Sequence, residues 1–373
     1  MAADLFRRAV WSPSAASARD PQRFATVDAL WEDLLTRGLR SPMFRLVRDG
    51  ATLAPSSYCR PAGVGDRRLD DVVRPNRVVE LHRAGATLVL QGLQLTDPHL
   101  GRFANNLALV LDHPVQVNAY LTPRAATGLE LHFDFHDVFV VQLDGHKRWR
   151  VWDPLPRTVA PVRGGPPTPM PTFDELGPPV LDLTLSAGDC LYLPRGFPHA
   201  AEAMNAASVH LTVGVMAVTW PKVLTAALDA ALAEPGLRAS LPAGVLGGVD
   251  PGRPALDALL AQLDPALVRA WLADEIWRRQ PATRLAPVVA PPRASCVRVT
   301  PGPLLWLRAD GPRTVLGLGD RHLSLPGEAH GFLAALLASP QRFDADAWPG
   351  PLDAASRAVV VERLATEGVV VPA

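Results

Sequence analysis

Residues 131–152 constrain the fold more than any other part of this chain. They open on His132-Phe133-Asp134, continue through an apolar run with strand character, and turn at Asp144-Gly145. Successive side chains of a β-strand point to opposite faces, so His132 and Asp134 are expected to project from the same side. Two histidines and one carboxylate, with coordination positions left open, form the ligand set of non-haem Fe(II) oxygenases. The pattern therefore predicts two of the three ligands of such a site.

The third ligand is expected from a different strand, because a facial set of ligands must converge on the metal from more than one direction. His199 is the best candidate, since it follows a short apolar strand at 190–193 and a Pro/Gly corner. A lone His-x-Asp pattern recurs by chance, but its combination with this later stretch is far more specific. We therefore predict a metal site made by His132, Asp134 and His199. The alternative, a hydrogen-bonded pair with no metal, would bury a carboxylate at high cost.

The same stretches carry a family resemblance. The segments HFDFHDVFVVQLDGHKRW (132–149), GDCLYLPRGFPHAAEA (188–203) and SVHLTVGV (208–215) resemble those of JmjC-type, cupin-fold oxygenases, most closely the bacterial ribosomal oxygenases. AGATLVL (84–90) and VNAYLTP (117–123) are similar to the same family. The resemblance implies an α+β chain built on a double-stranded β-helix (cupin or jelly-roll) barrel. It also implies Fe(II), 2-oxoglutarate as cosubstrate, and O₂.

Lys147 is expected to face the same side as the metal ligands. If Asp144-Gly145 is a two-residue hairpin turn, Lys147 pairs with Gln142, and partners across two strands share a face. A straight strand from Asp134 to Gln142 would span ~27 Å, so it must break or bend near 135–137 for Lys147 to reach a molecule at the metal. The resemblance implies that Lys147 holds the distal carboxylate of 2-oxoglutarate. The alternative is an exposed lysine on a strand.

The resemblance assigns three more residues to the cosubstrate: Asn118, Tyr120 and Thr212. Asn118 and Tyr120 alternate on one face of an expected strand, and Thr212 shares a face with His210 and Gly214. Gly214 stands where relatives often carry a serine that helps to hold the cosubstrate, so Thr212 or water would have to replace that contact. The alternative for Asn118 and Tyr120 is ordinary core polarity.

His136 and Asp137 follow the predicted ligands directly. Adding them to the metal site would overfill it. We interpret them as groups that orient the ligands, which metal-binding histidines usually need.

Three domains are expected. Residues 1–220 would form the JmjC/cupin catalytic domain, with N-terminal helices before the barrel. Residues 221–281 have helical periodicity, and the resemblance implies that they form a dimerisation segment of a homodimer. Residues 293–373 would form a winged-helix-like domain. The patterns predict helices at 27–36, 69–84, 98–111, 223–232, 254–279, 331–337 and 354–366, and strands at 43–47, 87–90, 115–121 and 369–371.

Residues 154–179 interrupt the barrel strands with nine prolines. Loops of this length are usually functional or disordered. We interpret the segment as a lid or a substrate-guiding loop; a solvated linker is the alternative.

Composition limits the compartment and the partners. No apolar run approaches the ~18–20 residues of a membrane span, and the N-terminal residues lack the apolar core of a secretory signal. The cysteines, Cys59, Cys190 and Cys296, are far apart and odd in number, which favours a reducing cytoplasm over a disulfide framework. We expect a cytoplasmic protein that does not act on a membrane.

Charge disfavours DNA as a partner. The chain has 37 basic and 37 acidic residues, and residues 293–373 hold eight Arg, no Lys and eight Asp or Glu. A phosphate-binding face needs an excess of positive charge. A DNA-binding regulator is therefore a weaker alternative for the C-terminal domain.

The function implied by the resemblance is hydroxylation of a side chain, at the β-carbon of Arg or His, in a ribosomal protein or peptide. Three alternatives share the fold: a hydroxylase of natural-product precursor peptides, an N-methyl-lysine demethylase, and a non-catalytic metal-binding cupin module. Formaldehyde release would distinguish the demethylase. Metal analysis and an oxoglutarate-decarboxylation assay would distinguish the non-catalytic module.

Overall fold

The computed structural model describes residues 10–11, 26–36, 38–124, 126, 129–156, 169–233, 235–241, 243–249, nine positions between 257 and 276, 295–300, 305–318 and 321–373. The chain falls into two compact units, the first comprising residues 1–104 and 115–217 and the second residues 105–114 and 218–373. The three-domain division expected from the sequence stays a prediction.

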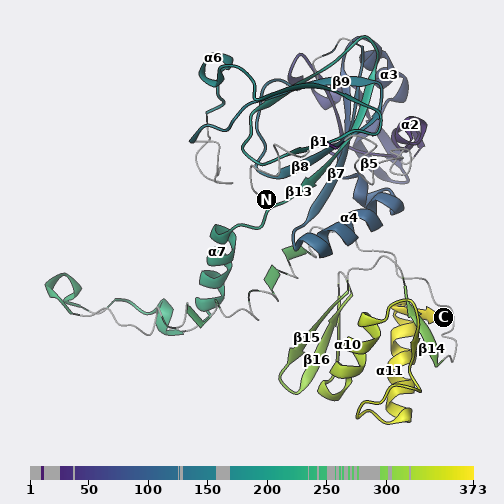
Figure 1. The fold of residues 1–373 in the computed structure, drawn as a ribbon, viewed down its shortest axis with the longest axis vertical. Coiled ribbons are helices and arrows are strands. Elements are labelled where there is room, and N and C mark those ends of the chain that lie inside the picture. Colours follow the sequence, from purple (N-terminus) through teal and green to yellow (C-terminus); the bar gives the residue numbers. More distant parts are fainter. Residues whose placement is uncertain are drawn as a thin grey trace. The chain divides into compact units, whose positions relative to one another are not determined.

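The first unit is built from two antiparallel sheets that curve into a barrel (Figure 1). The larger sheet has eight strands in the order β1-β11-β8-β13-β7-β6-β2-β3, and the smaller has three in the order β10-β9-β12. The larger sheet contains β1 (Val10–Trp11), β2 (Phe44–Arg48), β3 (Ala51–Thr52), β6 (Thr87–Leu90), β7 (Val115–Thr122), β8 (Asp137–Asp144), β11 (Cys190–Leu193) and β13 (Ser208–Val215). The smaller contains β9 (His146–Val151), β10 (Leu181–Ser186) and β12 (His199–Ala203). The predicted α+β fold class with a double-stranded β-helix is confirmed.

The hairpin expected at Asp144-Gly145 is wrong. Strands β8 and β9 belong to different sheets, and Lys147 pairs with Leu185 of β10 and Ala203 of β12 rather than with Gln142. Gly145 has φ 65°, and a Cβ at this position would lie 2.0 Å from the carbonyl oxygen of Ala207. Only glycine fits this positive φ and close approach. The chain therefore crosses from one sheet to the other here.

Strand β7 has one apolar face and one face that carries polar side chains. Its buried residues alternate as Val115, Val117, Ala119 and Leu121, which is the period-2 pattern of a strand with one apolar face. The intervening Asn118 and Tyr120 pair with Thr212 and His210 of β13 and therefore share their face. The polar face of β7 is the one that lines the site described below.

Helices of the first unit are α2 (Val27–Thr36), α3 (Pro75–Arg83) and the short α6 (Phe173–Leu176), with 3₁₀ turns η2 (Pro55–Ser57) and η3 (Leu93–Leu95). Helix α4 (Pro98–Leu111) begins in this unit. Helix α3 packs against β2 and β6. The helices predicted at 27–36 and 98–111 are confirmed, as are the strands at 43–47, 87–90 and 115–121 within one residue at either end.

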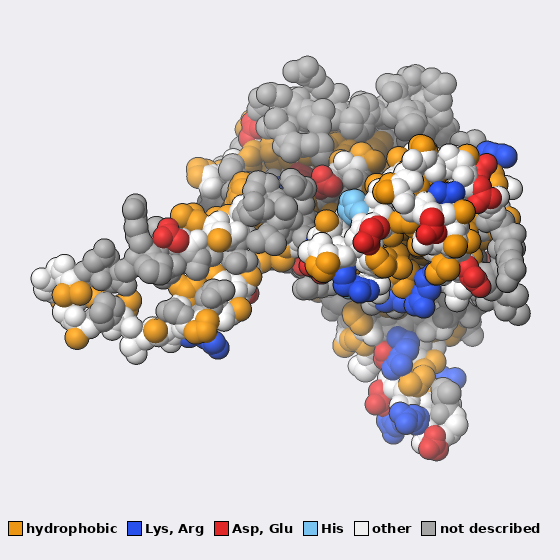
Figure 2. Space-filling model, turned by 90° about the horizontal axis from the view of Figure 1, so that it is seen from below, with side chains coloured by type: hydrophobic (Ala, Val, Ile, Leu, Met, Phe, Trp, Pro, Cys, Tyr) orange, Lys and Arg blue, Asp and Glu red, His pale blue; other side chains and the backbone are white. Residues whose placement is uncertain are grey.

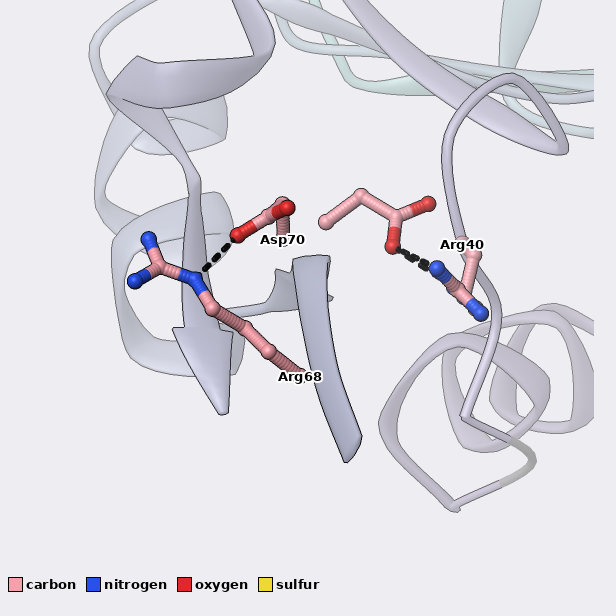
Figure 3. A network of polar contacts seen from close by, with 4 residues as sticks. Arg40, Arg68 and Asp70 are labelled. Atoms are coloured by element: carbon pink, nitrogen blue, oxygen red, sulfur yellow. Dashed lines mark hydrogen bonds and ion pairs between the residues drawn. The ribbon is translucent and has the colours of Figure 1, made fainter. Parts of the chain in front are cut away.

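The helix predicted at 69–84 is half wrong, because residues 67–73 form a strand. This strand, β5 (Arg67–Val73), pairs with β4 (Cys59–Val64) in a two-stranded hairpin. Pro75 begins α3 at its first turn, where a missing N–H costs nothing, and Arg74 before it is extended. Figure 3 shows ion pairs on this hairpin, in which Arg68 Nε lies 2.5 Å from Asp70 Oδ1 and Arg40 binds Asp71.

The second unit contains α7 (Trp220–Ala231) and the turns η4 (Pro235–Arg238) and η5 (Val245–Gly247). The helix predicted at 223–232 corresponds to α7. The helix predicted at 254–279 lies mostly outside the described residues, as does much of the proline-rich segment 154–179. None of the described helices is long and apolar enough to cross a membrane.

The described residues between 295 and 373 form two three-stranded sheets and two helices around their own core. One sheet has the order β18-β14-β19 and the other β15-β16-β17. Fully buried Leu316, Phe332, Leu333, Leu336 and Leu364 form the centre of the core. The elements are β14 (Cys296–Val299), β15 (Trp306–Asp310), β16 (Arg313–Gly317), β17 (His322–Pro326), η6 (Gly327–Ala329), α10 (His330–Ala338), β18 (Phe343–Asp344), α11 (Ala354–Thr366) and β19 (Val370–Pro372).

Candidate metal centre and cosubstrate pocket

Three side chains from two distant segments meet at one end of the barrel. One nitrogen or oxygen each of His132, Asp134 and His199 lies within 4.8 Å of the others, and no further such group occurs among the described residues. His132 and His199 form a reciprocal backbone bridge, with N···O distances of 3.1 and 2.8 Å. Residues 131–136 are otherwise irregular, because β8 begins only at Asp137. The expected break before β8 is confirmed. We call these three residues the metal end of the pocket.

The backbone fixes the protonation of both imidazoles. His132 Nδ1 lies 2.7 Å from the carbonyl oxygen of Glu130, and His199 Nδ1 lies 3.0 Å from that of Phe197. A carbonyl oxygen only accepts hydrogen bonds, so each Nδ1 carries the proton and each Nε2 keeps a lone pair. Metal-binding histidines are oriented in this way.

Burial keeps His199 neutral. Its side chain is 5% exposed, and desolvation, followed by the proximity of His132, lowers its pKa to about 4. The Asp134 carboxylate acts in the opposite direction but is outweighed. Asp134 Oδ2 lies 3.8 Å from His199 Nε2, which is too long for a direct hydrogen bond. A neutral imidazole that faces a carboxylate across such a gap is suited to share a cation with it.

A pocket runs from the metal end into the barrel. Its lining consists of Tyr120, Leu129, His132, Asp134, Val138, Val140, Lys147, Trp149, Leu193, His199, Ala201, His210 and Thr212. Its wall contains the aliphatic side chains of Leu129, Val138, Val140 and Leu193 beside the polar ones. The sequence-predicted residues in the pocket are thus the three at the metal end together with Lys147, Tyr120 and Thr212.

Lys147 lines the same pocket and is buried. Its side chain is 3% exposed, and Nζ donates to Thr122 Oγ1 at 3.1 Å. Desolvation lowers its pKa to about 7. The exposed strand lysine considered as an alternative is therefore wrong. The inward orientation was predicted, although through a pairing with Gln142 that does not exist.

Two aromatic residues beside Lys147 were missed by sequence reasoning. His210 stacks on Tyr120 with ring centroids 4.8 Å apart, and Trp149 meets His210 edge-on at 5.6 Å. His210 Nδ1 and Trp149 Nε1 are both buried without a hydrogen-bond partner in the described structure. We call Lys147, His210 and Trp149 the deep end of the pocket, although the ring of Trp149 also lies 5.9 Å, centroid to centroid, from that of His199. The one signal in the sequence that indicated His210 was its position two residues before Thr212, which places both side chains on the same face of a strand.

The electrostatics of the deep end follow from its burial. Desolvation first, and then the charge of Lys147, lower the pKa of His210 well below its usual value, so the ring is neutral. Desolvation raises the pKa of Tyr120 to about 12, although hydrogen bonds with Thr212 and Arg45 act against this shift. Lys147 is the one lysine or arginine among the residues that line the described pocket.

Asn118 lies apart from the residues that line the pocket. Its Oδ1 accepts from the backbone amide of Gly92 at 3.0 Å and from Gln116 Nε2 at 3.1 Å. The side chain thus fastens η3 to β7. A cosubstrate contact for Asn118 remains a prediction.

Gly214 has a packing reason that the sequence did not reveal. It lies on β13 with an ordinary extended φ, so the backbone does not require glycine there. A Cβ at this position would lie 2.7 Å from His136 Cδ2, closer than real Cβ contacts. The imidazole of His136 therefore occupies the space that a serine side chain at 214 would need.

Comparison with known proteins agrees with this geometry. A family model described as JmjC domain matches residues 94–223. Ribosomal oxygenase 1 of Danio rerio is 42% identical over 123 residues, which are 31% of this chain and 22% of that protein. Ribosomal oxygenase 1 of Homo sapiens is 36% identical over 162 residues, 42% of this chain and 25% of that protein. A Dictyostelium discoideum protein named bifunctional lysine-specific demethylase and histidyl-hydroxylase NO66 is 33% identical over 160 residues, 42% and 31% of the two chains.

The chain spans between 22 and 31% of the length of these three relatives. Solved structures match over nearly the whole chain. YcfD, a ribosomal oxygenase from Escherichia coli in complex with cobalt and succinic acid, has a TM-score of 0.56 at 17% identity, covering 99% of this chain and 97% of that one. The complex of YcfD with cobalt and 2-oxoglutarate has a TM-score of 0.54 at 19% identity, with the same coverage. At these identities the likeness establishes the fold. A JmjC domain model thus matches residues 94–223 of this chain, and the YcfD structures share its fold over nearly its whole length.

Proposed function

We propose that this protein is an Fe(II)- and 2-oxoglutarate-dependent oxygenase that hydroxylates a side chain, at the β-carbon of Arg or His, in a ribosomal protein or peptide. The observation that supports the proposal most directly is a single pocket with a two-histidine, one-carboxylate cluster at one end and a buried ammonium at the other. The names of the relatives, ribosomal oxygenase and histidyl-hydroxylase, support the same reaction class.

The metal end fits Fe(II). Two imidazoles, each oriented by a carbonyl contact at Nδ1, and one carboxylate would occupy one face of the ion. Three positions would remain for a bidentate cosubstrate and O₂. Bound iron and 2-oxoglutarate would supply the oxidising chemistry, and the protein would supply their orientation.

The deep end fits a carboxylate. Lys147 is buried with one hydroxyl partner, and the ring N–H of Trp149 has no hydrogen-bond acceptor. An ammonium buried without an anion is costly, whereas hydrogen bonds between an ammonium and a carboxylate are strong. Lys147 would therefore bind the distal carboxylate of 2-oxoglutarate. His210 Nδ1 would donate to the same carboxylate in the tautomer that carries its proton there.

The wall between the two ends keeps the reaction away from water. Val138, Val140 and Leu193 line it and are almost completely buried. Tyr120 and Thr212 lie on the same wall, where they would contact the cosubstrate between its two ends. A dry pocket strengthens the interaction of Lys147 with a bound anion.

The test of the function is mass spectrometry. Ribosomal proteins and peptides derived from them are incubated with the enzyme, Fe(II) and 2-oxoglutarate, and the expected product has gained one oxygen on an Arg or His residue. The His132→Ala variant serves as the matched control. Oxygen gain on peptides of other origin would favour a precursor-peptide hydroxylase, and no succinate production with any substrate would leave a metal-binding module.

A demethylase is the second candidate, because one relative carries that activity in its name. Demethylation of N-methyl-lysine releases formaldehyde, whereas hydroxylation of a β-carbon does not. Formaldehyde and hydroxylated product measured in the same reaction mixture distinguish the two outcomes.

We also propose a cytoplasmic homodimer that does not bind DNA. Helix α7 exposes Trp220, Leu224 and Leu228, spaced four residues apart and therefore on one helix face, with exposed fractions of 71, 47 and 47%. Figure 2 shows hydrophobic side chains exposed among the described residues on the face that it draws. A stripe of this kind favours a partner helix, and a second copy of the chain supplies one. Light scattering should give the mass of a dimer, and Leu224→Glu with Leu228→Glu should give that of a monomer.

A further inference from the structure

The two segments that carry the metal ligands are held together by an interrupted backbone ladder. Strands β8 and β11 pair regularly as far as Val138 and Leu193. Pairing resumes where the amide of Gly196 donates to the carbonyl of Asp134 at 2.9 Å, and ends in the bridge between His132 and His199. Between these points the two segments form no strand pair with each other, although Asp137 pairs with Val215 of β13. An interruption directly beside three metal ligands needs another way to fix their spacing.

The side chain of Asp137 fills this interruption. Its carboxylate is buried, and Oδ1 accepts from the hydroxyl of Tyr192 at 2.9 Å and from the backbone amide of Arg195 at 3.2 Å. Tyr192 is fully buried. Desolvation and the neighbouring Asp137 raise the pKa of Tyr192, so the phenol stays protonated and donates. One carboxylate oxygen thus ties the start of β8 to both the end of β11 and the loop that leads to His199.

We propose that this carboxylate clasp, formed by Asp137, the Tyr192 hydroxyl and the Arg195 amide, sets the affinity of the metal site. Asp137 lies outside the cluster of three ligands and acts as a positioning residue. It holds the His199 segment at the distance from His132 and Asp134 at which all three can reach one ion. The inference rests on the proposed metal site and extends it to a residue that binds neither metal nor cosubstrate.

The clasp acts on geometry rather than on charge. Without it, the loop at 194–198 retains the Gly196 contact and the bridge at His199, but its amide at Arg195 loses its acceptor. Outer partners of metal ligands typically contribute about 10- to 100-fold in metal affinity. An asparagine at 137 keeps an oxygen that can accept from both donors, so the geometric role predicts that Asp137→Asn is close to the wild type.

The experiment measures Co(II) binding to the full chain, without oxoglutarate or substrate, by calorimetry and by the visible absorption of the bound ion. Asp137→Ala should weaken Co(II) binding about 10- to 100-fold and alter the absorption bands. Tyr192→Phe should weaken it by a smaller factor, because the Arg195 amide keeps its acceptor. Asp137→Asn should restore binding to within a few-fold of the wild type. The matched control is Asp182→Ala, which removes a carboxylate bound by Arg148 at 2.8 and 2.7 Å on the smaller sheet and should leave Co(II) affinity unchanged.

Each outcome bears on a different claim. If the wild type binds no Co(II), the proposed metal site fails and the clasp fails with it. If the wild type binds and folded Asp137→Ala binds equally well, the clasp alone is wrong. Asp137→Asn as weak as Asp137→Ala would assign the effect to charge and overturn the geometric role. Thermal melting without metal shows which variants are folded, and Tyr192→Phe with Asp137→Asn carries the test if Asp137→Ala does not fold.

Discussion

At the metal end of the pocket, both imidazoles donate to backbone carbonyls, whereas at the deep end His210 Nδ1 and Trp149 Nε1 have no hydrogen-bond partner in the described structure. The first end is held by main-chain geometry. The second contains buried polar groups that a bound anion would stabilise. The difference indicates that the metal ligands are arranged before any ligand binds, while the deep end depends on the cosubstrate for its electrostatic balance.

The largest effect should come from removing a metal ligand. His132→Ala or Asp134→Ala should abolish succinate production, because two remaining ligands on a facial site hold the metal too weakly for turnover. The fold should survive, since neither side chain belongs to the buried apolar core. Succinate is measured by mass spectrometry and folding by circular dichroism. Turnover like that of the wild type in either variant would contradict the ligand assignment.

Removing the buried ammonium group of Lys147 should weaken binding at the deep end of the pocket and leave the metal end unchanged. Lys147→Ala should raise the apparent KM for 2-oxoglutarate by roughly 10- to 150-fold. This range corresponds to a loss of about 1.5–3 kcal/mol of binding free energy, the usual contribution of a hydrogen bond to a charged group. Co(II) affinity without oxoglutarate should not change, because Lys147 does not contact the metal end. An unchanged KM would remove the proposed role of Lys147, and a parallel loss of metal affinity would show that the two ends are not independent.

The pH dependence of cosubstrate binding should report on the same residue. The pKa of Lys147 is about 7, and a bound carboxylate raises it because it stabilises the ammonium. Binding above pH 7 therefore takes up a proton, and the Kd for 2-oxoglutarate should rise by up to about tenfold per pH unit. Lys147→Arg keeps its charge at all these pH values and should flatten the profile. Calorimetry at pH 7, 8 and 9 measures both; a wild-type Kd that does not depend on pH would be evidence against a neutral lysine.

The smallest effect should come from the contact between Gly214 and His136. Gly214→Ala should destabilise the protein by about 1 kcal/mol, the low end of the cost of overpacking, because the imidazole of His136 is partly exposed and can move. In the His136→Ala background the same substitution should cost less. Urea unfolding of the four variants gives the coupling free energy. Equal costs in the two backgrounds would mean that His136 does not occupy that space.

Local sequence patterns were sufficient for several helices and strands and for the cluster of candidate metal ligands. The apolar periodicity of residues 27–36 and 98–111 predicted α2 and α4, and the alternation at 115–121 predicted β7. The stretches around His132 and His199 predicted three residues that the structure brings within 4.8 Å of one another. These signals are local because each depends on side-chain period or on a short motif.

The strand pairing and the long-range contacts of those elements could not be predicted in the same way. Residues 144–145 read as a hairpin turn, yet β8 and β9 join different sheets. Residues 69–73 fit helical spacing, yet they pair with β4. The deep-end residues His210 and Trp149, and the contact of Asp137 with Tyr192, join positions far apart in the chain.

The sequence by itself determined which residues could bind a metal and an organic anion, since the identity of a side chain fixes its chemistry. Only the tertiary structure decided that Lys147 is buried and that His136 packs against Gly214. It also decided that the carboxylate of Asp137 connects β8 to the segment that leads to His199. Burial and strand pairing are properties of the whole fold, because each strand takes the neighbour that buries the most apolar surface and satisfies the most backbone groups.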